Sequence, residues 1–263
     1  MAVHAAEAHG DVPELSNWVR WAEHHWHGSP WVGWLPHWEN VVFSLAIALT
    51  LSVLAGRFGR RPTMVPARGQ NLLESLVEAI DGLVHSILGH QGRQYTPFVG
   101  SLFLYIWFMN MAGLIPGVKS PTSSLNTTIA LALVVFGFVH YTGIKRLGVI
   151  GYCDHLAGQP RDIVGWLLVP LMLPIHLLGE LIKPLSLSLR LGFNVFAEDV
   201  LLAVLVGLGI AAGLALHVPI GIPIQIFVVP LVLIFSTVQA LVFSLLASVY
   251  IAQMLPHAEE GHH

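Results

Sequence analysis

The sequence has little charge for its length. Only 10% of its 263 residues are charged, 55% are apolar, and the mean hydropathy is +0.71. A soluble domain carries about 25% charged residues. Because each charge that enters a bilayer core must leave water, membrane-spanning segments contain few charges. The shortage of charge therefore predicts an integral membrane protein surrounded by membrane lipid.

Cysteine and runs of basic residues are scarce as well. The single cysteine, Cys153, excludes an intrachain disulfide framework and a zinc cluster built on thiolates. With a formal net charge of −3 and no long basic run, a nucleic-acid partner is not expected. Residues 1–40 lack a positively charged start followed by an apolar run, so we expect no cleaved signal peptide and no transit peptide.

Residues 1–38 are polar and rich in tryptophan and histidine. Tryptophans at this density, just before an apolar run, indicate an interfacial belt. The histidines suggest a metal site, but no acid or cysteine completes one, so a solvated or interfacial loop is preferred. The histidines in question are His24, His25, His27 and His37. We expect residues 1–38 to form an N-terminal segment and residues 39–263 to form a single membrane domain.

Apolar runs and turn residues predict the first membrane elements. A span covers about 41–55, and spans over about 97–114 and 125–141 form a helical hairpin around a turn rich in proline and glycine. A polar loop is expected over 145–161.

The segment 70–85 has the period of an amphipathic helix that is too charged to span a membrane. One expected face carries Glu74, Glu78 and Asp81. The other expected face carries Leu73, Leu76, Val77, Ile80 and Val84. We expect this helix to lie at the interface or against a partner.

Two long apolar segments follow, over about 163–216 and 223–255. The first is much longer than the roughly 20 residues that cross a bilayer. It must therefore be tilted, bent or broken, and Pro170, Pro174 and Pro184 provide places to bend. The expected fold is an all-α membrane protein with one N-terminal span, an interfacial helix, a hairpin and two long tilted helices.

The lysines and arginines predict the orientation. With the N-terminus outside, the cytoplasmic side receives Arg57, Arg60, Arg61, Arg68, Arg93, Lys145, Arg146 and Arg161. The outside then receives only Arg20 and Lys119. This bias predicts a periplasmic N-terminus and a cytoplasmic C-terminus. A bacterial inner membrane is expected as the location.

A polar stripe follows the first long segment. If this segment is helical, its ionisable and amide side chains share one side of the rod. They are His176, Glu180, Lys183, Arg190, Asn194 and Glu198. Asp199 lies about half a turn away from Arg190 and is expected to face elsewhere.

Arg190 is the most informative member of this stripe. An arginine at the bilayer centre costs about 2.5–3.5 kcal/mol on insertion scales, so it needs a carboxylate partner, a water-filled cavity or both. Because arginine stays protonated, it can expel a proton from a nearby carboxylate without carrying the proton itself. We interpret Arg190 as the barrier of a proton path. The alternative is that it pairs with Glu180 or Glu198 only to hold the helices together.

The last long segment carries a second, uncharged stripe. Gln225, Ser236, Gln239 and Tyr250 fall within a narrow arc on helical geometry. Two polar stripes on apolar helices suggest that the helices face each other or share a third partner. Ordinary interhelical hydrogen bonds, worth about 0.6 kcal/mol each, are the simpler explanation when no charge lies nearby.

At these residues the sequence resembles the a subunit of bacterial-type F-ATP synthases, over about residues 41–255. The resemblance depends on four motifs in order. They are Trp107-Phe-Met-Asn-Met-Ala-Gly-Leu-Ile-Pro, Leu125-Asn-Thr-Thr-Ile-Ala-Leu-Ala-Leu, Lys183-Pro-Leu-Ser-Leu-Ser-Leu-Arg-Leu and Thr237-Val-Gln-Ala-Leu-Val-Phe.

The resemblance implies two long helices wrapped along a ring of c subunits, within an F1Fo complex that also contains peripheral-stalk b subunits. It implies that Arg190 faces the ring carboxylate between two aqueous half-channels, with Gln239 and Asn194 nearby. Protons would enter one half-channel, travel on the ring and leave by the other. No cofactor is implied, and catalysis belongs to the assembled complex.

Two features depart from the family pattern. Gly192 and Phe193 are transposed relative to the usual Arg-Leu-Phe-Gly-Asn, which is expected to alter how closely the helix approaches the ring. Val232 stands where many relatives have a histidine or acid. We hypothesise that Glu198, Asp199 and His176 compensate for this missing partner.

Two other classes of protein were considered. A secondary transporter would use Arg190 to bind an anionic substrate, but the halves of the chain show no internal repeat and the last helix has no charge for a coupling ion. A membrane-embedded enzyme would show a His-Glu-x-x-His helix, a Gly-x-Ser-x-Gly turn or an intramembrane aspartate pair, and the sequence has none of these. It also lacks the Gly-x-x-x-x-Gly-Lys-Ser/Thr loop that would bind the phosphates of ATP.

Overall fold

The computed structural model describes Trp18, His25 and residues 38–59, 68–115, 117–158, 163–217 and 223–255. Within these ranges the regular structure is entirely helical, as the composition predicts. Most of the N-terminal segment lies outside the described residues, as do three of the four histidines considered as metal ligands. Trp18 donates a backbone hydrogen bond to the carbonyl of Gly117 at 2.9 Å, which places it at the turn of the hairpin.

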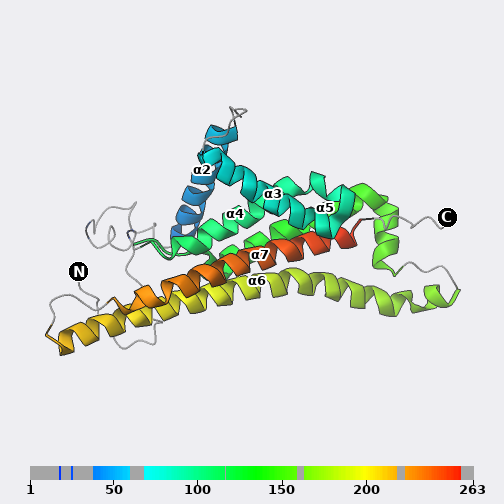
Figure 1. Ribbon diagram of the computed structural model, residues 1–263. Coiled ribbons are helices and arrows are strands. Elements are labelled where there is room, and N and C mark those ends of the chain that lie inside the picture. The colour runs from blue at the N-terminus through cyan, green and yellow to red at the C-terminus, as the bar shows by residue number, and fades with distance from the viewer. Residues whose placement is uncertain are drawn as a thin grey trace.

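The first membrane helix, α2 (Glu39–Gly59), confirms the predicted span and is steeply inclined to the long helices (Figure 1). It contacts α4 (Thr96–Ala112), the first helix of the hairpin. The contact includes a hydrogen bond between the hydroxyls of Ser44 and Tyr105 at 2.6 Å. Most of the remaining surface of α2 is apolar and exposed. The Ser44–Tyr105 hydrogen bond therefore fixes the side of α2 that faces the protein.

The amphipathic helix is α3 (Arg68–Leu88), followed by the short 3-10 helix η2 (Gly89–Gln94). Ile80 and Val84 are buried and Glu74 and Glu78 are exposed, as predicted, but Val77 is exposed rather than buried. Asp81 also differs from the prediction. It accepts a hydrogen bond from Thr96 Oγ1 at 2.6 Å, so it binds the first turn of α4 rather than lying with the exposed acids.

The hairpin consists of α4 and α5 (Leu125–Leu156), joined by a turn that contains the 3-10 helix η3 (Pro121–Ser123). The predicted hairpin is confirmed, but the predicted loop over 145–161 is wrong for most of its length. The helix continues to Leu156 and breaks only at Gly148, whose φ of +72° and ψ of 166° are nearly restricted to glycine. The apolar residues after this break fold back, so that the ring of Tyr152 lies against Gly143.

The long helix α6 (Ile163–Ala215) contains 53 residues without interruption, although three prolines lie inside it. At 1.5 Å per residue it is about 80 Å long. The 3-10 helix η4 (Ile224–Phe227) and α7 (Val229–Gln253) make up the second long segment. In Figure 1, α6 runs the length of the molecule as a gently bowed rod, and α7 lies beside it in the opposite direction.

The core lies among α3, α4, α5 and α7, and the inner side of α6 packs on α5 and α7. Its fully buried members include Ile106, Met109, Leu191, Phe243 and Ile251. Trp107 Nε1 donates to Thr237 Oγ1 at 2.9 Å and ties α4 to α7. Among the described residues, four helices (α2, α5, α6 and α7) are long and apolar enough to cross a membrane, and α4 is a shorter apolar helix. The chain is an all-α membrane protein.

Candidate functional site

The two predicted polar stripes meet in the part of the α6–α7 contact that follows Arg190 along α6. Asn194 Nδ2 donates to Gln239 Oε1 at 2.9 Å, and Ser236 Oγ donates to Glu198 Oε2 at 2.9 Å. Gln239 and Ser236 are buried, so these bonds form away from the exposed side of the helix pair. The prediction that the two stripes face each other is confirmed here. Gln225 is an exception, because it lies in η4 and not on α7.

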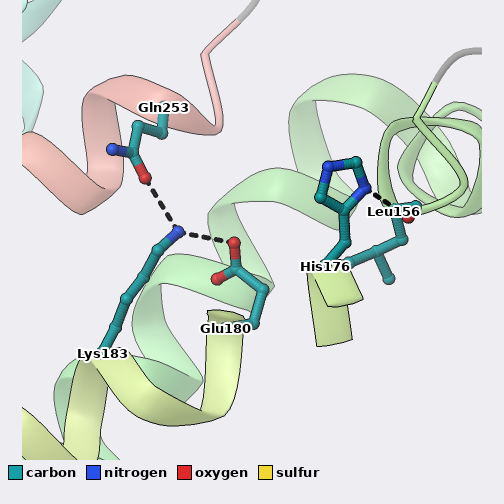
Figure 2. A network of polar contacts seen from close by, with 5 residues as sticks. All are labelled: Leu156, His176, Glu180, Lys183 and Gln253. Carbon is teal, nitrogen blue, oxygen red and sulfur yellow. Dashed lines mark hydrogen bonds and ion pairs between the residues drawn. The ribbon is translucent and has the colours of Figure 1, made fainter. Parts of the chain in front are cut away.

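The other half of the contact contains a charged network around Lys183 (Figure 2). The Lys183 ammonium donates to Glu180 Oε1 at 2.5 Å and to Gln253 Oε1 at 2.8 Å. It also lies 5.5 Å from the centre of the Tyr250 ring, within cation–π range. Gln253 was not among the predicted residues, although its position at the end of α7, three residues beyond Tyr250, was a usable signal.

His176 lies one turn before this network and faces a different element. Its Nδ1 is 3.1 Å from the carbonyl oxygen of Leu156, at the end of α5 (Figure 2). Twenty-two residues separate His176 from Glu198 on one helix, which corresponds to about 33 Å. His176 therefore does not contact Glu198 or Asp199, and the hypothesis that the three compensate for the partner missing at Val232 stays a prediction.

Arg190 lies between the two polar groups along α6, and its side chain is exposed. Apolar side chains of the uncovered side lie next to it on the helix, among them Phe193, which is 55% exposed. Among the described residues, no carboxylate lies within the 4.0 Å ion-pairing distance of its guanidinium. Glu180 pairs with Lys183 instead, and Glu198 accepts from Ser236. These contacts do not support the alternative in which Arg190 only ties the helices together.

Glu198 and Asp199 face different elements, as predicted. Glu198 faces α7, whereas Asp199 lies against the end of α4. An ideal Cβ on Gly113 would come within 2.9 Å of Asp199 Oδ1. The absence of a side chain at Gly113 therefore leaves the space that the carboxylate of Asp199 occupies.

A buried chain of polar groups lies beside these acids. Thr122 Oγ1 donates to Asn110 Oδ1 at 2.7 Å, and the hydroxyls of Thr122 and Ser120 lie 2.9 Å apart. Asn110 Nδ2 donates to the carbonyl of Ser236 at 3.3 Å. The chain links the hairpin turn to α7, next to the Ser236–Glu198 bond. These residues were not predicted from the sequence, because isolated Ser, Thr and Asn near a turn carry no signal of burial.

The two departures from the family pattern have clear positions. Val232 is buried, one turn before Ser236 on α7. Gly192 faces α5 and not the outer side, because a Cβ there would lie 2.9 Å from Leu125 Cδ2 and 3.1 Å from Thr128 Oγ1. The expected effect of the Gly192–Phe193 transposition on the approach to a ring stays a prediction. The glycine allows α6 to approach α5, and Phe193 is placed on the outer side.

Comparison with known proteins gives a consistent result. The profile of the family described as ATP synthase A chain matches residues 40–252. The chain is 40% identical over 250 residues to the ATP synthase subunit a of Protochlamydia amoebophila, covering 95% of this chain and 92% of that protein. It is 35% identical over 221 residues to the ATP synthase subunit a of a Sulfurihydrogenibium species, covering 84% and 99%. It is 36% identical over 240 residues to that of Aliarcobacter butzleri, covering 90% and 94%.

Proposed function

The chain belongs to the ATP synthase A chain family, and on that premise we propose that it is the proton-conducting stator subunit of a rotary F-type ATP synthase. The observation that carries the proposal is the position of Arg190. A permanent charge is exposed on a membrane helix whose uncovered side is apolar, with separate polar groups before and after it along α6. A residue in this position costs free energy unless an anionic partner meets it.

The outer side of α6 is the proposed contact with the ring of c subunits. It is a long apolar surface that no other described element covers, and large exposed apolar surfaces mark interaction sites. Among the exposed side chains are Leu178, Ile182, Leu185, Phe193, Phe196 and Val204. Ring carboxylates that pass along this surface would meet Arg190, whose charge favours loss of their protons.

The two polar groups are the proposed half-channels. Glu198 lies eight residues after Arg190, about 12 Å along the helix, and Lys183 lies seven residues before it, about 10 Å. The outer half-channel contains Glu198 and Asp199, and the inner one contains Glu180 and Lys183. Because Arg190 stays protonated, it prevents protons from passing directly between them. Protons must then cross on the ring, which makes rotation obligatory.

We place the hairpin turn and the N-terminus on the periplasmic side. The backbone hydrogen bond from Trp18 to Gly117 supports one side for both segments. Arg146 lies at the other end of α5 and donates to Gln94 Oε1 at 2.5 Å, close to the basic residues expected in the cytoplasm. Peripheral-stalk b subunits would bind on the side of α2 and α3, away from the outer side of α6. The expected location is the inner membrane of a bacterium.

Disulfide cross-linking tests the ring contact. We expect Phe193→Cys to cross-link to a cysteine placed beside the ring carboxylate of a c subunit, in a chain in which Cys153 is replaced by serine. Leu45→Cys on α2 is the matched control, because Leu45 is 58% exposed on an apolar helix away from α6. The measurement is the yield of the cross-linked pair on non-reducing gels.

A cross-link from Leu45→Cys but not from Phe193→Cys would contradict the proposed ring contact. Purification of the chain without any c subunit would favour the transporter alternative, in which Arg190 binds an anionic substrate. The two outcomes differ in whether a ring is present at all.

A further inference from the structure

A small cavity lies between α5, α6 and α7, on the proposed cytoplasmic side of Arg190. Water-sized spheres can fill about 10 Å³ of it, which is room for about one water molecule, and it is partly open to the outside. Three of its polar side chains belong to the network around Lys183: Glu180, Lys183 and Tyr250. The fourth is His140, on α5. Leu187 lines the same cavity only three residues before Arg190, so the cavity reaches within one helical turn of it.

His140 has no role in the site as described so far. The centre of its ring lies 3.8 Å from that of Phe136, with the two planes tilted by 42°, and 5.9 Å from that of Tyr152 in an edge contact. These two aromatic contacts restrict the position of the imidazole. Its Nδ1 is buried and has no hydrogen-bond partner among the described residues. A buried polar atom without a partner is costly, and in a cavity with other polar walls a water molecule is the usual partner.

The other polar groups of the cavity are already engaged. Lys183 donates to both Glu180 and Gln253, and its charge lies near the ring of Tyr250. The lysine and the glutamate therefore stabilise each other as charged groups. His140 differs from them, because an imidazole can accept a proton at one ring nitrogen and release a proton from the other near neutral pH.

We propose that His140 is a proton-transferring residue of the cytoplasmic half-channel, contributed by α5 as a third wall opposite Glu180, Lys183 and Tyr250. The proposal rests on the proposed function. A proton released from a ring carboxylate near Arg190 passes through water in the cavity to the imidazole. A second proton leaves the imidazole for water on the cytoplasmic side, so the charge of the ring is restored after each transfer.

Silver-ion accessibility tests whether water reaches His140. The variant is His140→Cys in a Cys153→Ser chain, within the complete ATP synthase in inverted vesicles, whose cytoplasmic side faces the medium. Tyr141→Cys is the matched control, since Tyr141 is the next residue on α5 and is 61% exposed on the outside of the helix group. We expect Ag⁺ to inhibit ATP-driven pumping by His140→Cys but not by Tyr141→Cys.

Labelling of the cysteine by N-ethylmaleimide, measured by mass spectrometry, gives the same comparison if the His140→Cys variant pumps too slowly. Equal reactivity at the two positions, or reaction only at Tyr141→Cys, would overturn the proposal.

Passive proton conduction tests whether His140 transfers protons. After removal of the soluble head, we expect His140→Leu to lower the conduction of the vesicles by about tenfold, since a positioned proton-transferring side chain contributes about a hundredfold or more and water replaces part of it. We expect the ionisable variant His140→Glu to keep more conduction than His140→Asn, which a purely structural role does not predict. Conduction at the wild-type level in His140→Leu would overturn the proposal. If Arg190→Ala abolishes ATP-driven pumping by the intact complex, such a failure concerns His140 alone and leaves the proposed function intact.

Discussion

At the scale of single residues, the neighbouring acids Glu198 and Asp199 occupy different environments. Ser236 binds Glu198 at the contact with α7, whereas the space left by Gly113 admits Asp199 to the end of the hairpin. The buried position of Val232 leaves no ionisable partner on the adjacent turn of α7. Under the proposed function, the two acids would provide two separate places at which a proton can enter from the periplasmic side. Loss of one acid alone should be partly compensated by the other.

The double variant Glu198→Gln, Asp199→Asn should lower ATP-driven proton pumping by inverted vesicles. We expect a decrease of about tenfold to a hundredfold, the range in which a positioned proton-transferring group contributes. Each single variant should retain more activity than the double variant. The control is Glu78→Gln, which removes an exposed acid on α3, far from α6. Unchanged pumping in the double variant would show that neither acid belongs to the outer half-channel.

Some of these residues could be predicted from the sequence, and others could not. The stripe from His176 to Glu198 is visible because polar residues in an apolar segment stand out at helical period. The same argument predicted its contact with Ser236 and Gln239. It could not identify His140 or Thr122, whose surroundings are set by helices distant in sequence. The contact of His176 with the carbonyl of Leu156 could not be predicted either, because it depends on where the end of α5 packs.

At the scale of helices, α5 shows how one glycine ends a straight element. The pair Lys145 and Arg146 predicted the start of a loop, but both side chains are exposed on a helix that continues beyond them. Gly148 provides the actual break, and the apolar residues after it return to the core through Tyr152. The sequence contains this glycine, but the φ and ψ angles it adopts depend on the packing of Tyr152. The three prolines of α6 were expected to be places to bend, and α6 is a bowed but unbroken helix.

Replacement of Gly148 by alanine should open the end of α5. The observed backbone angles cost about 1–3 kcal/mol for a residue with a side chain, which corresponds to an increase of about fivefold or more in the locally open state. The measurement is the rate of trypsin cleavage after Lys145 and Arg146 in inverted vesicles. Gly137→Ala is the control, because Gly137 is helical and has no neighbouring atoms within 4 Å of an added Cβ. Equal cleavage rates for Gly148→Ala and the wild type would contradict the strain argument.

At the scale of the whole molecule, the length of α6 sets the arrangement. A helix of about 80 Å is more than twice the thickness of a hydrocarbon core of about 30 Å, so α6 cannot cross the membrane upright. Its inner side packs on α5 and α7, while its outer side stays uncovered along most of its length. The fold therefore leaves one long surface open to a partner. Arg190 lies at this surface, between two polar groups that both contact α7.

The measurement that tests this account most directly is ATP-driven acidification of inverted vesicles that contain either the wild-type chain or Arg190→Ala. ATP hydrolysis by the soluble head and assembly of the complex are measured in the same preparations. The account predicts that Arg190→Ala abolishes pumping, while the complex still assembles and the detached head still hydrolyses ATP. Full pumping by an assembled Arg190→Ala complex would contradict the role of Arg190 as the barrier between the half-channels.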